Sequence, residues 1–437
     1  MTEKQPEHIN ASLIEARKRV LGVKFPTFYK DPVHLVRGEG VWVWDADGRR
    51  YLDCYNNVPH VGHCHAKVVE AISRQAATLN THTRYLHEGI IRYAEKLTAT
   101  FEDPLNSVLM TCTGSEANDI GLRMAEAVTG NRGVIVTDHT YHGNTTAVAQ
   151  LSATNPPRTG DARHIRFVPA PDSYRPLGGA GGPPHALAFA ETVRAQIDDL
   201  NANGHGLAAL MVCPYFANEG FPDLHSGFLD PAADIVRAAG GVIIADEVQP
   251  GFGRIGSHMW GHQRIGVKPD IVTLGKPMGN GHPVAGVVTS ADILTAFQDS
   301  FRYFNTFGGN PVSCAAAEAV LDVLEEEGLM AQANDVGAYA RGLLRDLAGQ
   351  HDCIGDVRGS GLFFGAEMVL NRETKKPATA FTAEIANNMR QEGILINFLG
   401  INFNVLKIRP PMQFTRSNAD QLIETLDRVL AHTELKE

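Results

Sequence analysis

Two strand-like segments of this chain end in oppositely charged residues, and this pairing constrains the fold more than any other feature. Residues 242–245 run directly into Asp246, and residues 269–274 are followed by Gly275 and then Lys276, 30 positions after Asp246. Both segments are short and apolar, as buried strands are. In an open α/β sheet, residues at such strand ends meet at the carboxyl edge, where ligands bind. We therefore expect Asp246 and Lys276 to lie together at one sheet edge.

An amine and a carboxylate at one site match the requirements of pyridoxal phosphate. The amine of Lys276 can hold the cofactor aldehyde as a Schiff base, and the carboxylate of Asp246 can keep the pyridine nitrogen protonated, so that the ring accepts electrons. Taken singly, the two residues fit a strand-end carboxylate and a solvated surface lysine, because charged loop residues are common. Two further segments favour the cofactor.

The first of these segments is a helix start. Residues 113–118 read Thr-Gly-Ser-Glu-Ala-Asn, and they follow an apolar run and open a helical pattern that reaches Val128 and is closed by Gly130. Backbone N–H groups at such a start, together with the Ser115 hydroxyl, suit a phosphate. A Gly-Ser start alone is more often an ordinary N-cap.

The second segment carries an aromatic ring. Tyr141 follows the strand-like run 133–137, so its ring is expected near the next strand end. It can stack on a pyridine ring, although a loop tyrosine is usually only packed.

The order and wording of these segments resemble the class III aminotransferases, which are fold type I pyridoxal-phosphate enzymes. The resemblance runs from about residue 40 to residue 411. It implies an α/β fold with a mostly parallel central sheet wrapped by helices, and a smaller α+β domain formed by both termini. It further implies that Gly114 and Ser115 hold the cofactor phosphate and that Lys276 forms the covalent link to the cofactor. Around the pyridine ring, Tyr141 is expected to stack on one face and Val248 to cover the other, while Asp246 pairs with the ring nitrogen and Gln249 approaches the ring hydroxyl. Thr306 is expected to reach the cofactor phosphate bound by the neighbouring subunit. The active site is thus expected to be shared within a homodimer, or a dimer of dimers.

The chain is longer than a usual single domain, at 437 residues. Strand-like and helix-like runs alternate between about residues 60 and 320, as in a parallel sheet wrapped by helices. We predict an N-terminal segment of a small domain at 1–60, a large cofactor-binding domain at 61–320 and a C-terminal small domain at 321–437. Residues 155–186 are rich in Pro and Gly and are predicted to be an extended surface excursion.

Charge and composition exclude several other classes of protein. A net charge of −10 and a pI near 6.0 disfavour nucleic acid and anionic membranes as partners. No apolar stretch approaches the roughly 20 residues of a membrane span. The six cysteines show no CxxC spacing, which fits free thiols in a reducing compartment. A cytoplasmic enzyme is expected.

His60, His63, Cys64 and His65 are candidate zinc ligands by residue type. Adjacent residues point in different directions, however, and no second ligand pair follows at structural-zinc spacing. We therefore predict no metal site, and interpret the segment as a turn whose histidines cap backbone or line the pocket.

Two departures from the family pattern argue against amino transfer. Aminotransferases of this class clamp a substrate carboxylate with an arginine, where this chain has Lys407, a compact charge that suits a phosphate equally well. In those aminotransferases, a glutamate-rich turn binds this arginine when the other substrate occupies the site. If residues 213–220 are aligned to that turn without a gap, both of its glutamates are replaced in this chain. A shift of one residue would restore Glu219 as the partner.

Several separated segments instead resemble the branch of ethanolamine-phosphate phospho-lyases and the related phosphohydroxylysine phospho-lyases. These segments are residues 57–65, 84–87, 278–283 and 303–309. The expected reaction eliminates phosphate from O-phosphoethanolamine and yields acetaldehyde and ammonia. A leaving phosphate needs preorganised cations. The candidate substrate-binding residues are Lys407 and Arg84, with Tyr85 and Asn57.

Three hypotheses follow for the function. A carbon–oxygen lyase acting on a small phosphorylated amine is favoured by Lys407 and by the branch-like segments. An ω-amine:keto-acid aminotransferase is the alternative, because the cofactor machinery is common to both. A catalytically silent scaffold is disfavoured, since every cofactor position holds the expected residue. The sequence does not separate phosphoethanolamine from 5-phosphohydroxylysine as the substrate.

Overall fold

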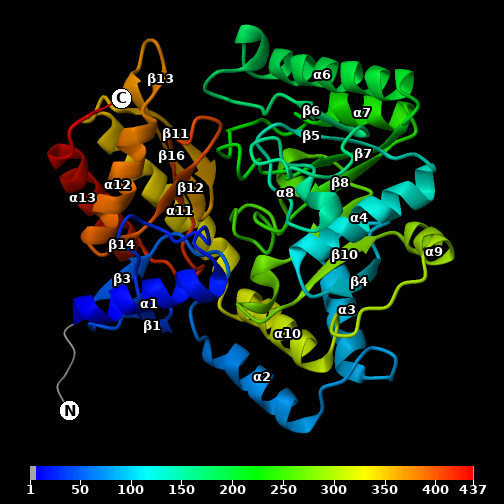
Figure 1. Cartoon of the computed structure of the whole chain (residues 1–437), viewed down its shortest axis with the longest axis horizontal. Helices are drawn as coiled ribbons and strands as arrows, with labels where there is room; N and C mark the ends of the chain where they lie inside the picture. The colour runs from blue at the N-terminus through cyan, green and yellow to red at the C-terminus, as the bar shows by residue number, and fades with distance from the viewer. Residues whose placement is uncertain (1–5, 437) are drawn as a thin grey trace.

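A seven-stranded sheet forms the centre of the larger part of the molecule, in a computed structural model that describes residues 6–436 (Figure 1). Its strand order is β4-β10-β9-β8-β7-β5-β6, and β10 is the one strand antiparallel to its neighbours. The strands are β4 (Ser107–Thr111), β5 (Gly133–Thr137), β6 (Ile165–Val168), β7 (Leu207–Val212), β8 (Val242–Asp246), β9 (Ile271–Leu274) and β10 (Ala285–Thr289). The predicted mostly parallel α/β sheet is confirmed.

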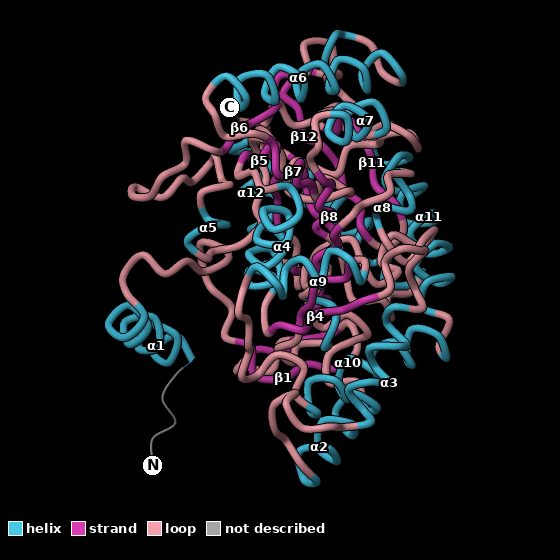
Figure 2. The backbone as a smooth tube through the Cα atoms, turned by 90° about the vertical axis from the view of Figure 1, so that its right-hand side faces the viewer, coloured by secondary structure: helices cyan, strands magenta, loops and turns pink. Residues whose placement is uncertain are grey.

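Helices cover both faces of this sheet because its strands are apolar on both sides. Val134 and Val136 of β5 pack in one core cluster with α4 (Gly114–Thr129). Ile135 between them packs in another cluster with α6 (Pro183–Ala202) and α7 (Asp230–Ala238). Successive side chains of a strand point to opposite faces, so every residue of such a strand is buried. Figure 2 shows α6 and α7 on the side of the sheet away from α4.

The two ends of the chain build the remaining sheets together. One sheet has the order β1-β2-β3-β14, in which β3 pairs in parallel with β14. A second sheet has the order β11-β12-β16-β15, with β13 paired to β12. The strands are β1 (Leu35–Glu39), β2 (Trp42–Asp45), β3 (Arg50–Asp53), β11 (Ile354–Ser360), β12 (Phe363–Asn371), β13 (Lys376–Pro377), β14 (Ile394–Leu395), β15 (Asn397–Leu399) and β16 (Val405–Ile408). Figure 1 shows the blue N-terminal strands beside the orange and red C-terminal elements. The domain boundaries at 60 and 320 stay predictions.

The remaining helices surround these sheets. α2 and α3 pack against α10, and α11 and α13 pack together behind the C-terminal sheet. Figure 2 shows α1 set off from the main body. Among residues 6–436, no helix combines the length and hydropathy of a membrane span. The remaining helices that surround the sheets are α1 (Pro6–Leu21), α2 (Ala66–Thr78), α3 (Glu88–Thr98), α5 (Thr146–Ala149), α8 (Gly261–Ile265), α9 (Ala291–Ser300), α10 (Pro311–Glu326), α11 (Leu329–Ala348), α12 (Thr379–Gln391) and α13 (Arg416–His432). Two short 3₁₀ turns are η1 (Leu177–Gly179) and η2 (Lys276–Gly279).

The Pro- and Gly-rich segment 155–186 was predicted to be an extended surface excursion, and it also contains regular structure. It contains the edge strand β6, which pairs in parallel with β5. Its last residues begin α6, whose first turn holds Pro183 and Pro184. Proline suits this position because the first turn of a helix leaves its N–H groups unpaired. The proline pair therefore marks a helix start rather than a longer loop.

The C-terminal sheet depends on a glycine at its centre, which generates the first prediction. A Cβ on Gly365 in β12 would stand 1.8 Å from the carbonyl oxygen of Leu406. Gly365→Ala is expected to lower stability by on the order of 2 kcal/mol through overpacking, measured as the midpoint of thermal unfolding. The control is Gly342→Ala in α11, where a Cβ meets nothing within 4 Å and alanine is expected to stabilise the helix. Equal midpoints for the two variants would contradict the packing argument.

Candidate active site

A cavity of about 240 Å³ lies at the carboxyl edge of the central sheet. Its walls come from the ends of β4, β5, β7, β8 and β9. Seven of the residues predicted for cofactor binding line it, namely Gly114, Ser115, Tyr141, Asp246, Val248, Gln249 and Lys276. The topology of a parallel sheet thus brings together residues that are up to 162 positions apart, from 114 to 276.

One wall of the cavity is the first turn of α4. Thr113 caps this helix by accepting the Glu116 N–H at 3.2 Å, and the Glu116 carboxylate accepts the Thr113 N–H at 3.0 Å in return. The first N–H groups of a helix have no acceptor within the helix, so those of Gly114 and Ser115 are available to an anion. A Cβ on Gly114 would stand 3.0 Å from Val248, and a larger residue would therefore close the cavity.

Asp246 is held by three donors and is almost fully buried, at 5% exposure. His142 Nδ1 lies 2.6 Å from Oδ2, and the Asn118 amide donates to the same oxygen at 3.0 Å. The Val248 N–H donates to Oδ1 at 3.0 Å. Thr140 holds the other nitrogen of His142 at 2.9 Å. This arrangement fixes the carboxylate in one orientation toward the cavity.

Lys276, which follows β9, also lines the cavity and has an unusual backbone φ of 23°. Its side chain is exposed there. Burial lowers its pKa, and the nearby Asp246 opposes this shift. A lowered pKa increases the fraction of neutral amine, which is the nucleophilic form.

A pair of buried cations lies behind Gln249. Lys407 Nζ donates to Gln249 Oε1 at 3.0 Å and to the carbonyl of Ala217 at 3.2 Å. Arg409 Nη1 donates to the same Gln249 oxygen at 2.7 Å, and its guanidinium lies 4.7 Å from the ring centre of Tyr55. Lys407 is 2% exposed and Arg409 is 6% exposed. We call Lys407 and Arg409 the cation pair.

The cation pair has no carboxylate partner within ion-pair distance in residues 6–436. Arg409 Nε also lies buried without a hydrogen-bond partner. Burial lowers the pKa of Lys407 well below its usual value, and Arg409 and Lys276 lower it further. Burial also lowers the pKa of Arg409. These directions mean that the protonated forms of both side chains are disfavoured in the free protein, so an anion bound beside them would stabilise their charge.

The alternative partner for this position, Glu219, is turned elsewhere. Its Oε1 accepts the Thr137 hydroxyl at 2.5 Å, and its Oε2 accepts the backbone N–H of Asn218 at 3.0 Å. Burial raises the pKa of Glu219. The alignment shifted by one residue would require Glu219 to pair with Lys407. The structure does not show this pair.

Five predicted residues do not line the cavity, namely Lys407, described above, and Arg84, Tyr85, Thr306 and Asn57. Arg84 stacks its guanidinium 3.7 Å from the ring centre of Phe304. Tyr85 is 66% exposed, and Thr306 is exposed on the loop before α10. Asn57 is buried near the end of β3, with its amide nitrogen unpaired. Their roles in binding stay predictions.

The histidines at 60–65 are engaged separately. His63 Nε2 lies 2.7 Å from Asp53, and His65 Nε2 lies 2.9 Å from Glu327. His60 Nε2 lies 2.7 Å from the carbonyl of Phe252. Within residues 6–436, no group of three or more His, Cys, Asp or Glu residues is placed to hold a metal ion.

Sequence reasoning missed Arg409 and His142. Arg409 lies two positions after Lys407, and the period of two along a strand places such residues on one face. That signal was present in the run Lys-Ile-Arg-Pro-Pro. His142 adjoins Tyr141, but no local pattern connects it to Asp246, which is 104 positions away.

Comparison with known proteins identifies the family to which this chain belongs. The Aminotransferase class-III family matches residues 27–430, so the chain belongs to this family and is a pyridoxal-phosphate-dependent enzyme. A solved phospholyase from Arthrobacter in complex with phosphoethanolamine is 44% identical, with a TM-score of 0.93 over 97% of this chain and 100% of that one. The Drosophila melanogaster alanine–glyoxylate aminotransferase 2-like protein is 42% identical over 94% of this chain and 85% of its own length. The Caenorhabditis elegans ethanolamine-phosphate phospho-lyase homolog 1 is 37% identical over 96% and 93%.

The cavity fits this cofactor by its own chemistry. The bare Cα of Gly114 leaves space at a helix N-terminus for a phosphate, and Asp246 presents a fixed carboxylate. Lys276 supplies an amine, and Tyr141 and Val248 supply the flanking faces. We propose that these residues, with Ser115 and Gln249, hold pyridoxal phosphate as the family pattern implies.

Lys276 is expected to be the sole attachment point of the cofactor. Borohydride reduction of the loaded wild-type enzyme should fix one pyridoxyl group on the peptide that contains Lys276, measured by peptide mass spectrometry. Lys276→Ala should bind the cofactor without fixation, because no other amine lines the cavity among the described residues. The control Lys268→Ala, at an exposed lysine, should behave as wild type. Fixation on another lysine would contradict the assignment.

Proposed function

We propose that this enzyme is a phospho-lyase that converts O-phosphoethanolamine and water into acetaldehyde, ammonia and phosphate. The observation that carries the proposal is the buried cation pair, Lys407 and Arg409, which lacks a carboxylate partner in the described chain and lies beside the cofactor cavity. A buried charge without a partner is costly unless a ligand neutralises it. A dianionic phosphate supplies that charge.

The chemistry of the pair favours phosphate over carboxylate. A planar arginine fork alone would match a carboxylate with two parallel hydrogen bonds. Here a compact lysine ammonium and an arginine approach from one side, so that two positive charges face one group. A leaving phosphate carries close to two negative charges, which such preorganised cations stabilise.

The residues of the site divide the work of the elimination. When bound, pyridoxal phosphate supplies an electron sink for the carbon beside the substrate amine. Lys276, whose lowered pKa favours the neutral amine, takes the proton from that carbon. The C–O bond of the next carbon then breaks, and phosphate leaves with the bonding electrons toward Lys407 and Arg409. Water supplies the oxygen of acetaldehyde, and no amino acceptor is consumed.

The relatives support this proposal unequally. The Arthrobacter phospholyase structure contains phosphoethanolamine, and the Caenorhabditis protein carries a phospho-lyase name. The Drosophila relative carries an aminotransferase name at 42% identity. An ω-amine:keto-acid aminotransferase is therefore the second candidate function. The position of Glu219, bonded to Thr137 rather than to Lys407, favours the lyase. 5-Phosphohydroxylysine stays the alternative substrate.

A homodimer with shared active sites is the assembly we propose. Large apolar side chains are exposed on two touching segments around Arg84, with Leu86 at 103%, Phe307 at 69% and Phe304 at 40% exposure. Such an exposed patch is typical of an interface. A second copy would cover it and bring Thr306, Arg84 and Tyr85 toward the neighbouring cavity. A cytoplasmic location stays part of the proposal.

The lyase reaction is expected to proceed without a keto acid. The enzyme loaded with pyridoxal phosphate is incubated with O-phosphoethanolamine alone, and phosphate and acetaldehyde are measured over many turnovers. The proposal predicts equal amounts of both products. A second arm supplies 5-phosphohydroxylysine to rank the two substrates by kcat/KM.

The opposite result identifies the aminotransferase. In that case phosphate is not released, a simple amine converts the cofactor to its pyridoxamine form, and pyruvate restores the starting absorbance. Observation of this cycle at useful rates, with no phosphate release, would overturn the lyase proposal.

Substrate binding is expected to weaken with rising pH because Lys407 must be protonated to bind phosphate. Its pKa is lowered by burial, so the loss begins below the usual pKa of lysine. Above that point KM should rise about tenfold per pH unit. Lys407→Arg keeps its charge and should remove this rise, while titration of the substrate itself affects both enzymes equally. Identical pH profiles for the two enzymes would remove Lys407 from the phosphate site.

A further inference from the structure

We propose that Arg358 is a positioning residue for the cation pair, an inference that rests on the proposed function of that pair. Arg358 lies on β11 and holds the turn of residues 216–221, which we call the support turn. The support turn contacts Lys407 and Gln249 directly. Arg358 thus acts on substrate phosphate through this turn and does not touch the substrate itself.

The strand register places Arg358 and Lys407 in one row. Arg358 of β11 pairs with Gly365 of β12, and Gly365 pairs with Lys407 of β16. Directly opposed residues of neighbouring strands project from the same face. The two cations therefore flank Gly365, about 10 Å apart between their backbones. A Cβ on Gly365 would stand 3.0 Å from the Phe221 ring, so the support turn packs over the bare glycine between the two cations.

Both cations of this row hold carbonyl groups of the support turn. Arg358 Nε donates to the carbonyl of Gly220 at 2.9 Å. Lys407 Nζ donates to the carbonyl of Ala217 at 3.2 Å. Between these points, Asn218 Oδ1 accepts the amide of Gln249 at 3.1 Å, and Gln249 orients the cation pair. A shift of the turn would move every one of these partners.

The support turn needs an external restraint because its backbone is strained. Phe216 has a φ of 47°, Gly220 of 106° and Phe221 of 42°. L side chains rarely adopt positive φ, and such conformations persist only where the surroundings fix them. Arg358 provides this restraint at Gly220, directly before Phe221. A Cβ on Gly220 would lie 3.1 Å from Arg358 Nη2, so the guanidinium packs closely on the turn.

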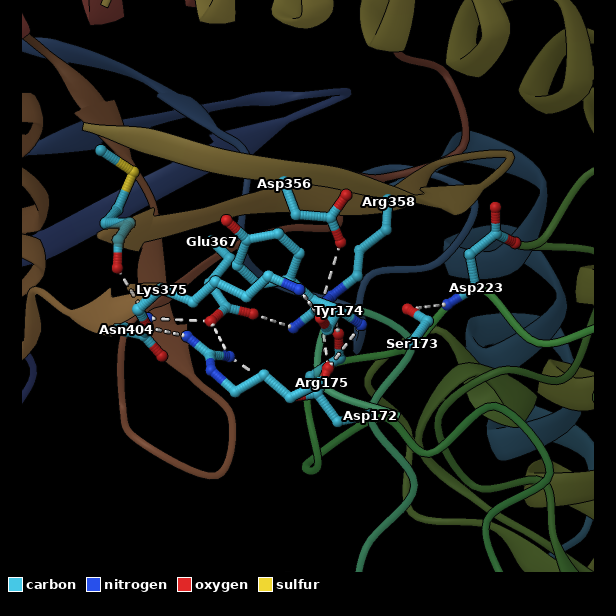
Figure 3. A network of polar contacts seen from close by, with 12 residues as sticks. Asp172, Ser173, Tyr174, Arg175, Asp223, Asp356, Arg358, Glu367, Lys375 and Asn404 are labelled. Atoms are coloured by element: carbon cyan, nitrogen blue, oxygen red, sulfur yellow. Dashed lines mark hydrogen bonds and ion pairs between the residues drawn. The ribbon is translucent and has the colours of Figure 1, made fainter. Parts of the chain in front are cut away.

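Arg358 is itself fixed by a buried charge network (Figure 3). Its guanidinium lies 2.8 Å from Glu367, 3.2 Å from Asp356 and 3.4 Å from Asp172, at 3% side-chain exposure. Asp172 comes from the segment after β6, whereas Asp356 and Glu367 belong to the C-terminal sheet. The network therefore joins the two parts of the molecule at the support turn.

Arg175 offers a matched control within the same network. It pairs with Asp172 at 3.3 Å and also with Glu367, and it donates to the carbonyl of Lys375. Figure 3 shows both arginines converging on the same two carboxylates. Among residues 6–436, the polar contact of this network with Gly220 comes from Arg358. Loss of either arginine removes charge from the network, but loss of Arg358 also removes the bond to Gly220 of the turn.

The test compares Arg358→Gln with Arg175→Gln in enzyme loaded with pyridoxal phosphate. Inorganic phosphate is titrated calorimetrically, so that binding is measured without turnover. Arg358→Gln should raise the phosphate Kd about tenfold, the effect of one charged hydrogen bond, and Arg175→Gln should stay within about twofold of wild type. The KM for O-phosphoethanolamine should rise by the same factor as Kd, with a smaller change in kcat. Arg358→Lys, which retains one donor for Gly220, should recover part of the affinity.

The outcomes separate this inference from the proposed function. Equal phosphate affinity of the two glutamine variants, or a loss confined to thermal stability, would overturn the positioning role. If Arg358→Gln does not fold, Arg358→Lys carries the test, and wild-type phosphate affinity in that variant overturns the inference. A loss of phosphate binding specific to Arg358, in an enzyme that releases no phosphate from O-phosphoethanolamine, would support the positioning role and reject the lyase.

Discussion

Two basic side chains without a carboxylate partner, buried behind one glutamine, are the constraint on which this site depends. Lys407 and Arg409 share the amide oxygen of Gln249, and burial lowers the pKa of both. Such an arrangement is costly in the free protein. It is useful where an anion arrives, because the cations are already oriented and desolvated when the ligand's charge develops.

The rest of the fold places these charges beside the cofactor cavity. The parallel sheet brings Asp246 and Lys276 to one edge, while the cation pair comes from β16 and the residue after it in a separate sheet. The support turn joins the two, since it contacts Lys407 on one side and is held by Arg358 on the other. In our proposal, the substrate specificity of this enzyme thus depends on how the C-terminal sheet meets the cofactor site built by the central sheet.

Much of the fold and of the cofactor site was predictable from local pattern. Asp246 and Lys276 follow short apolar runs, and the capped helix start at 113–118 is marked by its own sequence. Arg409 was within reach of the same strand periodicity, but its importance depends on Gln249, 160 positions away. The partner of His142 and the role of Arg358 depend on contacts between elements distant in the chain, which no local pattern encodes. The helix start at the end of segment 155–186 was not predicted because proline marks helix starts as well as loops.

The account is tested most directly by a crystal structure of the Lys276→Ala variant, loaded with pyridoxal phosphate and soaked with O-phosphoethanolamine. This variant retains the substrate because the base and attachment amine are absent. The account predicts the substrate phosphate within hydrogen-bonding distance of both Lys407 and Arg409, with Gln249 released from at least one of them. Phosphate bound elsewhere, with both cations still on Gln249, would contradict it.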